Sequence, residues 1–396
     1  MCYHSRVRRS GPPHVACIVE TSMAFGRGIL SGVARYVRLN GPWTVYIEQR
    51  SLVDPSPPWL KSWDGNGVIS RLALRETRLL RSAGIHTVDL NDQGPGRCRP
   101  HIKSDHRAEG VLAAEHLLER GFASFAFFGY PQFAWSRDCR AGFTATLHTA
   151  GHSCNRYRRT QRVSLGHQQP SWELEVEGVA RWIRSLPKPL GLMACNDFRG
   201  IQALDACRRA GIAVPEEVAV IGVDDEELVC QLAYPPLSSV VPNAPRIGYE
   251  AAALLDRLMR GEPEPTASLS IAPAGITTRL STDVTAIADP DVAAAMRFIR
   301  EHASEGIGVA DVLSRVPVSR SVLQRRFRGL LGRSIHGVIA RVRLERVKQL
   351  LVETDLPLSV IAKRTGFSHV EYLSAAFRQA FGLPPGSYRR EHSELL

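Results

Sequence analysis

Residues 218–225 read Val-Ala-Val-Ile-Gly-Val-Asp-Asp, a run of six small or apolar residues that ends in two acidic ones. A continuous apolar run of this length is typical of a strand buried on both faces. Similar runs lie elsewhere in the first 284 residues, at 14–20, 43–48, 67–70, 87–90, 124–129 and 191–195. Amphipathic stretches that suit helices separate them. The pattern predicts parallel sheets covered by helices, with too many units for one compact sheet, and therefore an α/β region of two lobes.

Polar and aromatic residues follow these runs, at the point where each expected strand ends. In parallel sheets, ligands bind at the carboxyl ends of the strands. Carboxylates, amides and an arginine beside aromatic rings suit a polyhydroxylated ligand, because hydroxyl groups need both donors and acceptors. The candidates include Phe25, Arg27, Arg71, Tyr130, Asn196, Asp197, Asp224 and Asp225. The alternative, that Asp197 and Asp224 only cap the helices that follow them, stays open at this point.

The positive charge of the chain is unevenly distributed. Its 396 residues carry 50 Lys and Arg against 39 Asp and Glu, a net charge of +11. The last 112 residues hold 17 basic and 11 acidic residues, a net of +6, so they are roughly three times as basic per residue as the rest. Within them, residues 315–348 hold ten basic residues and one acid, Glu345. A solvated helix face would alternate its charges, so this run favours a nucleic-acid partner.

The same C-terminal residues carry the pattern of a helical domain. Helices are expected at 291–302, 309–316, 319–331, 335–351, 359–365 and 369–381. A short helix, a tight turn and a longer helix occur twice in this order, with one long helix between the two pairs. That order is typical of two helix-turn-helix units, each with a second helix that enters the major groove of DNA. A helical protein-interaction bundle is the alternative, and it fits the arginine density less well.

Other classes of function lack their signatures. The sequence has no Gly-x-Ser-x-Gly, no His-Glu-x-x-His and no complete dinucleotide or P-loop fingerprint, so we expect no enzyme and no cofactor. Its eight cysteines include no Cys-x-x-Cys pair, so we expect no metal site and mostly buried thiols. No run approaches the ~20 apolar residues of a membrane span. These absences, together with the charge, predict a cytoplasmic DNA-binding protein.

Two family resemblances follow from specific residues. Residues 285–391 resemble the DNA-binding domain of the AraC/XylS family, through Leu323-Gln324-Arg325-Arg326-Phe327, Leu358-Ser359-Val360-Ile361-Ala362, Gly366-Phe367, residues 372–382 and Pro384-Pro385-Gly386-Ser387-Tyr388-Arg389. Residues 14–283 resemble the sugar-sensing domain of LacI/GalR-type regulators, which is similar to periplasmic sugar-binding proteins. The carriers there are residues 220–225, Cys195-Asn196-Asp197 and Leu237-Ser238-Ser239-Val240.

Together the resemblances imply a fold class and a division of the chain. The fold class is an α/β two-lobed periplasmic-binding-protein-like sensor followed by an all-α domain with two helix-turn-helix units. The expected parts are a basic segment (1–13), the sensor (14–283), a linker (284–290), an AraC-type DNA-binding domain (291–391) and a tail (392–396). The N-terminal DNA-binding headpiece usual in LacI-type regulators is missing, because the sensor begins at residue 14.

The resemblance to AraC/XylS proteins also implies DNA-contacting positions. In the first unit these are Ser319, Arg320, Ser321, Gln324, Arg325 and Arg328; in the second they are His369, Val370, Glu371, Tyr372 and Arg378. Arg325 has the donors to bind guanine bidentately and the Gln324 amide suits adenine, whereas Arg328 suits phosphate. Many relatives carry an arginine where this chain has Ala375, so the second unit is expected to read its site more weakly, or through Glu371 and Tyr372.

For the sensor, the resemblance implies a sugar effector, a pentose such as xylose, and no other cofactor. Asn196 and Asp224 are the expected hydroxyl ligands, and Phe25 and Trp135 the expected ring platforms; Arg27 and Asp197 complete the candidates from the strand ends. Relatives with a sugar-binding arginine place it where this chain has Cys139, which makes Arg137 and Arg140 the alternatives.

The expected function is that of a sugar-responsive activator of pentose catabolic genes. It would bind promoter repeats in duplex DNA as a homodimer and contact RNA polymerase. Two rivals remain from the sequence. One is an AraC-type regulator whose sensor has lost sugar binding or senses another small molecule. The other is a sugar-modifying enzyme with an accessory binding domain.

Overall fold

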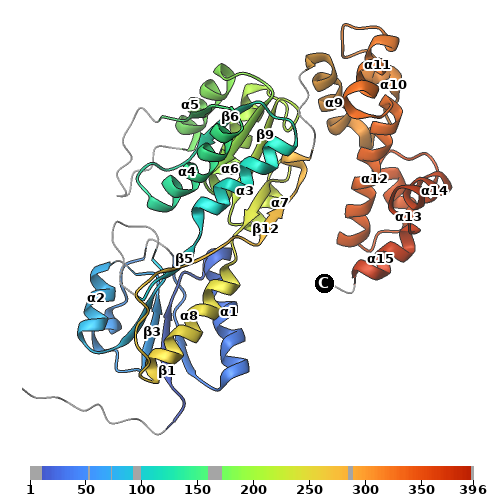
Figure 1. The fold of residues 1–396 in the computed structure, drawn as a ribbon. Coiled ribbons are helices and arrows are strands. Elements are labelled where there is room, and N and C mark those ends of the chain that lie inside the picture. The colour runs from blue at the N-terminus through green and yellow to red at the C-terminus, as the bar shows by residue number, and fades with distance from the viewer. Residues whose placement is uncertain are drawn as a thin grey trace, which may run out of the picture. The chain divides into compact units, whose positions relative to one another are not determined.

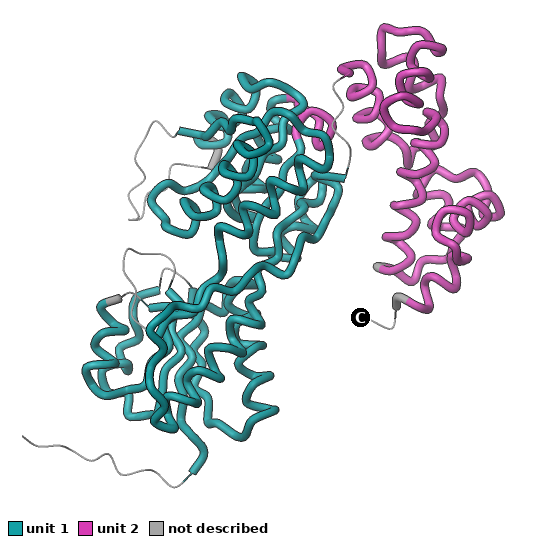
Figure 2. Tube along the Cα trace, in the orientation of Figure 1, with its two compact units in different colours: residues 1–210, 219–283 teal, residues 211–218, 284–396 magenta. Residues whose placement is uncertain are grey.

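The computed structural model describes residues 11–51, 54–72, 74–91, 100–158, 172–283 and 289–393. The chain divides into two compact units (Figure 2). The first comprises Met1–Ala210 and Ala219–Asp283, and the second comprises Gly211–Val218 and Val284–Leu396. The expected basic segment, linker and tail fall largely outside the described residues. No helix within the described ranges is both long enough and apolar enough to span a membrane.

The first unit contains two lobes, each built on its own sheet (Figure 1). The N-terminal lobe has four parallel strands in the order β2-β1-β3-β4. Alternate residues of β1 face opposite layers: Val15 and Cys17 pack towards α1 and α8, whereas Ala16 and Ile18 pack towards α2. The bounds are β1 His14–Ile18, α1 Ala24–Asn40, β2 Thr44–Ile47, β3 Gly67–Ser70, α2 Leu74–Ser82, β4 His86–Asp89 and α8 Ala244–Met259.

The C-terminal lobe has six strands in the order β12-β10-β9-β8-β6-β7, and β12 alone among them pairs antiparallel within the described residues. Helices α3 and α4 pack together, as do α5 and α6. The bounds are α3 His106–Glu119, β6 Ser124–Phe128, α4 Ala134–Thr149, β7 Cys154–Arg156, α5 Trp172–Ser185, β8 Leu190–Ala194, α6 Asp197–Ala210, β9 Val218–Val223, α7 Glu227–Leu232, β10 Ser238–Val241 and β12 Gly275–Thr277.

A small two-stranded sheet joins segments far apart in the chain. It pairs β5 (Ile102–Ser104) with β11 (Leu269–Ile271), in parallel. These strands lie where the chain passes between the two lobes (Figure 1). The predicted two-lobed α/β architecture is thereby confirmed, and so is the burial of most thiols: of six described cysteines, five are buried.

The second unit is helical apart from its Gly211–Val218 segment. Two apolar cores lie along it: one gathers residues of α9, α11 and the start of α12, including Ile299, Phe327 and Val338, and the other gathers the end of α12 with α13, α14 and α15, including Val347 and Phe377. The long helix α12 therefore belongs to both cores. The bounds are α9 Pro290–His302, α10 Val309–Leu313, α11 Arg320–Leu331, α12 Ile335–Glu353, α13 Leu358–Arg364, α14 Val370–Phe381 and α15 Pro385–Ser393.

The predicted pair of helix-turn-helix units is confirmed, with two differences. Helix α10 ends at Leu313, not at residue 316, because Pro317 disfavours a helical conformation at the residue before it. The structure also adds α15, whose start at Pro385 uses a residue that suits the first position of a helix.

Candidate effector site and nucleic-acid interface

The end of β9 holds two consecutive carboxylates in an unusual backbone conformation. Asp224 has φ 105° and Asp225 has φ 47°, a region that L-residues other than Asn and Asp rarely adopt. The Asp224 N–H still donates to the Val240 carbonyl (3.1 Å), so the ladder to β10 continues to the point where the chain turns. Strain of this kind persists only where the surrounding structure holds it, and it is common at ligand sites.

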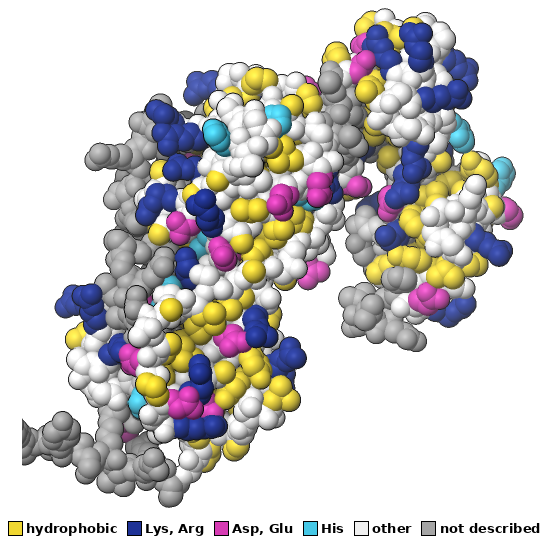
Figure 3. All heavy atoms as spheres, viewed as in Figure 1, with side chains coloured by type: hydrophobic (Ala, Val, Ile, Leu, Met, Phe, Trp, Pro, Cys, Tyr) yellow, Lys and Arg dark blue, Asp and Glu magenta, His cyan; other side chains and the backbone are white. Residues whose placement is uncertain are grey.

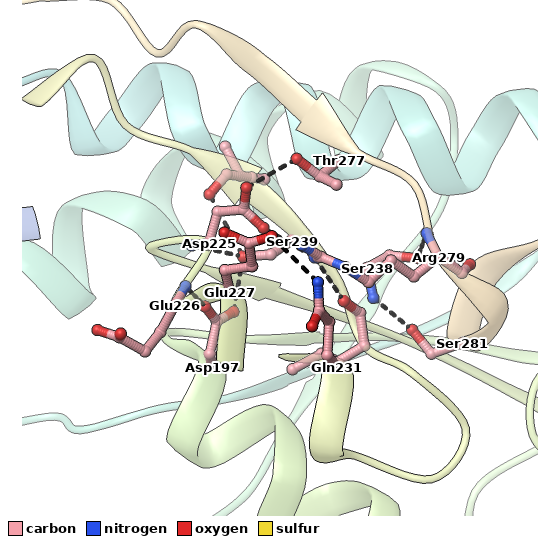
Figure 4. Close-up of polar contacts among 12 residues, drawn as sticks. Asp197, Asp225, Glu226, Glu227, Gln231, Ser238, Ser239, Thr277, Arg279 and Ser281 are labelled. Carbon is pink, nitrogen blue, oxygen red and sulfur yellow. Dashed lines mark hydrogen bonds and ion pairs between the residues drawn. The ribbon is translucent and has the colours of Figure 1, made fainter. Parts of the chain in front are cut away.

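The two carboxylates differ in their partners (Figure 4). Asp225 accepts from Arg279 Nη1 at 2.7 Å and from Thr277 Oγ1 at 2.8 Å. The Asp224 carboxylate has no hydrogen bond or ion pair to any residue that the structure describes. Burial raises the pKa of Asp224 well above its usual value; Asp197 and Glu109 raise it further, whereas His106 and Arg71 lower it. Asp224 is thus an acceptor with free hydrogen-bonding capacity.

Asp197, at the start of α6, uses both carboxylate oxygens within the protein (Figure 4). Its Oδ1 accepts from Ser239 Oγ at 2.6 Å, and its Oδ2 accepts from the Glu226 N–H at 2.8 Å. Burial raises the pKa of Asp197 to about 7, and these two hydrogen bonds oppose the rise. Asp197 therefore ties α6 to β10 and to the loop after β9. Its role as an effector ligand stays a prediction.

A second group of charged residues lies within electrostatic reach of Asp224. Glu109 is buried and accepts from Ser104 Oγ at 2.5 Å, and His106 Nδ1 lies 2.9 Å from its other oxygen. Arg71 pairs with Glu20, and its guanidinium lies 4.8 Å from the centre of the Phe25 ring. Phe25 itself is partly buried against the core of the N-terminal lobe. Arg71 and His106 each already have a carboxylate partner, so the group favours a neutral ligand over an anionic one.

An aromatic group forms after β6 in the C-terminal lobe. Phe133 and Trp135 stack with ring centres 5.7 Å apart, and Tyr130 meets both rings edge-on. Arg199 is buried, lies 4.1 Å from the centre of the Tyr130 ring and pairs with Glu175 at 2.8 Å. Sugar C–H faces pack well on exposed rings of this kind, and Trp135 is only partly buried.

The remaining effector candidates have contacts of their own. Asn196, just before α6, accepts at its Oδ1 from the Arg199 N–H at 3.0 Å, and its amide nitrogen has no hydrogen-bond partner among the described residues. Arg137 donates to the carbonyls of Pro131 and Gln132, and Arg140 lies near Cys154, where it opposes the burial that raises the pKa of that thiol to about 12. Cys139 is buried, at 1% exposure.

Arg27 and Glu226 form an ion pair of 2.7 Å that no sequence pattern indicated. Glu226, His106 and Glu109 are the residues of this region that the sequence analysis missed. Glu226 follows two acidic residues at the end of a strand, and its partner lies 199 residues away in the chain. No local signal reports a contact at that separation.

Most side chains of the predicted DNA-binding set are exposed on the second helix of each unit. Those on or beside α11 are exposed except Gln324, which is partly buried; those on or beside α14 are exposed except Val370, which packs on the second core. Ser319 caps α11 by accepting from the Val322 N–H. Figure 3 shows Lys and Arg side chains gathered on the face of the second unit that is in view.

Glycines at the turns allow the chain to change direction between these helices. Gly332 ends α11 with φ 65°, and Gly366, between α13 and α14, has φ 76°. A Cβ at position 366 would lie 2.5 Å from the Ala303 carbonyl oxygen, so only glycine fits there. Arg343 of α12 donates to the carbonyls of Ala303 (2.8 Å) and Ile307 (2.7 Å), which fixes α12 to the turn before α10.

The comparisons with known proteins agree with this arrangement. Residues 114–282 match the periplasmic binding protein-like domain family, and residues 312–391 match a helix-turn-helix domain family. The xylose operon regulatory protein of Escherichia coli is 31% identical over 397 residues, covering 96% of this chain and 98% of the relative. That of Haemophilus influenzae is 30% identical and covers 95% and 97%.

Solved structures give the same result. The structure of the xylose-binding transcription activator XylR superposes with a TM-score of 0.81 at 30% identity, covering 97% of this chain and 99% of that one. The transcriptional regulator CelR in complex with cellobiose, at 22% identity and a TM-score of 0.54 over 68% of this chain, shares the sensor fold. The chain belongs to the family of xylose operon regulatory proteins.

Proposed function

We propose that this chain is a sugar-responsive activator of pentose catabolic genes, with D-xylose as its effector. The observation that carries the sensor half is the Asp224 carboxylate, which is held in place by the end of β9 and has no partner among the described residues. A neutral polyol can donate hydroxyls to Asp224 and lay its C–H face on Phe25 or Trp135. The names of the relatives support xylose, because the solved relative is described as xylose-binding.

Titration calorimetry with D-xylose tests this proposal, with L-arabinose and D-ribose as comparison sugars. Saturable heat with D-xylose and weaker or no heat with the others would support it. No heat with any of the three would overturn the sensing part. Binding of a different small molecule would favour the second candidate, a sensor of altered specificity. The buried Cys139 favours that candidate, because it stands where relatives with a sugar-binding arginine carry that residue.

The DNA half of the proposal rests on α11 and α14 as reading helices. Each packs on an apolar core to which the long helix α12 contributes, so each unit can engage one half of a repeated site. Selection from a random duplex library, followed by footprinting, should give a protected site with two sequence elements. A single short element, or binding without sequence preference, would contradict reading by both units.

We further propose the division into 14–283, 284–290 and 291–391 as sensor, linker and reader, a homodimer in the cytoplasm, and contact with RNA polymerase when bound. The relatives are transcription regulators, and we propose that this chain likewise has no enzymatic activity and needs no cofactor. Sugar would close the two lobes and favour the arrangement in which both readers engage DNA. Linkage is reciprocal, so operator DNA should tighten sugar binding by the same factor.

A further inference from the structure

Glu226 connects the two lobes of the sensor. It directly follows the Asp224–Asp225 pair in the C-terminal lobe, and it is 7% exposed. Its carboxylate reaches the first turn of α1 in the N-terminal lobe: Oε2 accepts from the Ala24 N–H at 2.5 Å, and Oε1 accepts from Arg27 Nη2 at 2.7 Å. These two contacts, which we name the interlobe bridge, join residues about 200 positions apart in the chain.

Both groups that face the Glu226 carboxylate, the start of α1 and the Arg27 guanidinium, interact favourably with a negative charge. A carboxylate before the first turn of a helix faces unpaired N–H groups and the positive end of the helix dipole. Arg27 adds a charge-assisted hydrogen bond, although its side chain is 49% exposed and solvent screens the pair. The bridge therefore depends more on the partly buried contact with Ala24 than on the half-exposed guanidinium.

Glu226 is also fixed within its own lobe. Its N–H donates to Asp197 Oδ2, and Asp197 in turn accepts from Ser239 of β10 (Figure 4). Across the bridge, Ala24 immediately precedes Phe25, the ring expected to carry a sugar. A shift of one lobe against the other would break the contact with Ala24 before it disturbed either sheet.

We propose that Glu226 is a positioning residue for the effector: the interlobe bridge stabilises the closed arrangement of the lobes and fixes Phe25 at the site. This rests on the proposed function, in that a sugar held between the lobes binds only when they are closed. Apparent affinity falls in proportion to the closed fraction. Loss of the bridge should therefore weaken sugar binding without removing any group that touches the sugar.

Two readouts on the full chain test the proposal. The first is hydrogen–deuterium exchange of peptides that cover the start of α1, measured without sugar. The second is calorimetry with D-xylose. We expect Glu226→Ala to speed exchange there and to weaken D-xylose binding by about tenfold. Glu226→Gln keeps an acceptor for Ala24 and should weaken binding by only about threefold.

A matched control and a double-mutant cycle complete the test. Arg246→Met removes an ion pair of 2.6 Å with Glu250 that lies within α8, and it should leave both readouts unchanged. Arg27→Met should weaken binding in the wild-type background and have no further effect in the Glu226→Ala background. If Arg27→Met weakens binding equally in both backgrounds, Arg27 contacts the sugar itself and the bridge assignment is wrong.

Failure of this proposal differs from failure of the proposed function. If wild-type protein gives no heat with D-xylose, the effector assignment fails. Hydrogen–deuterium exchange then remains as the test of the interlobe bridge. Unchanged exchange at the start of α1 in a folded Glu226→Ala protein would overturn the bridge whatever the sugar result. Circular dichroism of each variant establishes that it is folded.

Discussion

Arg326 on α11 pairs with Asp291 on α9, with 2.7 Å between Nη1 and Oδ2. Asp289, the N-cap of α9, also lies 3.1 Å from the same guanidinium. Arg326 thus holds α11 against the start of α9. Its neighbour Arg325 is exposed and has no hydrogen-bond or ion-pair partner among the residues the structure describes. Two adjacent arginines of the basic run therefore differ in their surroundings: one is ion-paired within the domain and the other faces solvent.

We predict that Arg325→Ala weakens binding to the operator by about 10- to 100-fold, because a guanidinium bidentate to guanine contributes about 1–3 kcal/mol of discrimination. The loss should concentrate at one base pair of the site. Fluorescence anisotropy at fixed salt, with operators varied one position at a time, measures it. Unchanged affinity for every operator would exclude Arg325 as a base contact.

Arg326→Met serves as the comparison. It removes the ion pairs with Asp289 and Asp291. The two carboxylates remain at the N-terminus of α9, where they still interact favourably with the helix dipole. We expect a lower melting temperature of the reader, with DNA affinity of the folded protein little changed. If the Arg326→Met protein is as stable as wild type but does not bind DNA, then Arg326 is the DNA contact and not a structural ion-pair partner.

The helix-turn-helix half could be predicted closely because its signals are local. Caps such as Ser319 and turn glycines such as Gly366 lie at fixed offsets from the apolar positions of each helix. The buried strands of the sensor could be predicted for the same reason, since a run such as 218–223 needs no partner to be recognised. β5 and β11 could not, because each has three residues and pairs with a segment about 165 positions away.

The environment of the candidate effector residues was predictable only in part. Asp224 and Phe25 follow strands, and strand ends are where ligands bind. The same rule selected Asp197 and Arg27, whose charged atoms the structure shows bonded to Ser239, to the Glu226 N–H and to the Glu226 carboxylate. A sequence gives the position of a polar group along the chain, but whether another residue already occupies its hydrogen bonds depends on contacts across the fold.

Asp224→Asn should abolish detectable D-xylose binding while leaving the sensor at least as stable. The amide keeps the size of the carboxylate, and asparagine tolerates the positive φ of this position. It also removes an ionisable group whose pKa is raised in the folded state, which relieves a cost of folding above the ordinary pKa of the group. Asp225→Asn is the matched control: it should lower stability, because Arg279 loses the charge of its partner. Calorimetry and thermal unfolding separate the two outcomes.

His116 gives the sensor a pH-dependent stability. Burial, assisted by Arg120, lowers its pKa to about 4 from an ordinary 6.5, and its Nε2 lies 2.8 Å from Thr282 Oγ1. Between these pH values the unfolded chain binds more protons than the folded one. The free energy of unfolding therefore decreases as pH falls from 6.5 to 4, by about 2 kcal/mol with partial solvation allowed for. Urea unfolding at several pH values should show this slope, and His116→Gln should flatten it.

Substitutions at two turn glycines of the second helix-turn-helix unit distinguish the cost of backbone strain from the cost of a steric clash. Gly366 and Gly382 have similar left-handed conformations, with φ 76° and 80°. A Cβ at position 382 meets nothing within 4 Å, whereas one at position 366 would meet the Ala303 carbonyl oxygen at 2.5 Å. Gly382→Ala should cost about 1 kcal/mol, the strain of an L-residue in this region. Gly366→Ala should cost at least twice as much, since Ala303 is backbone and must move. Scanning calorimetry of the two variants measures the difference, and equal losses would show that the turn at Gly366 relaxes at no cost.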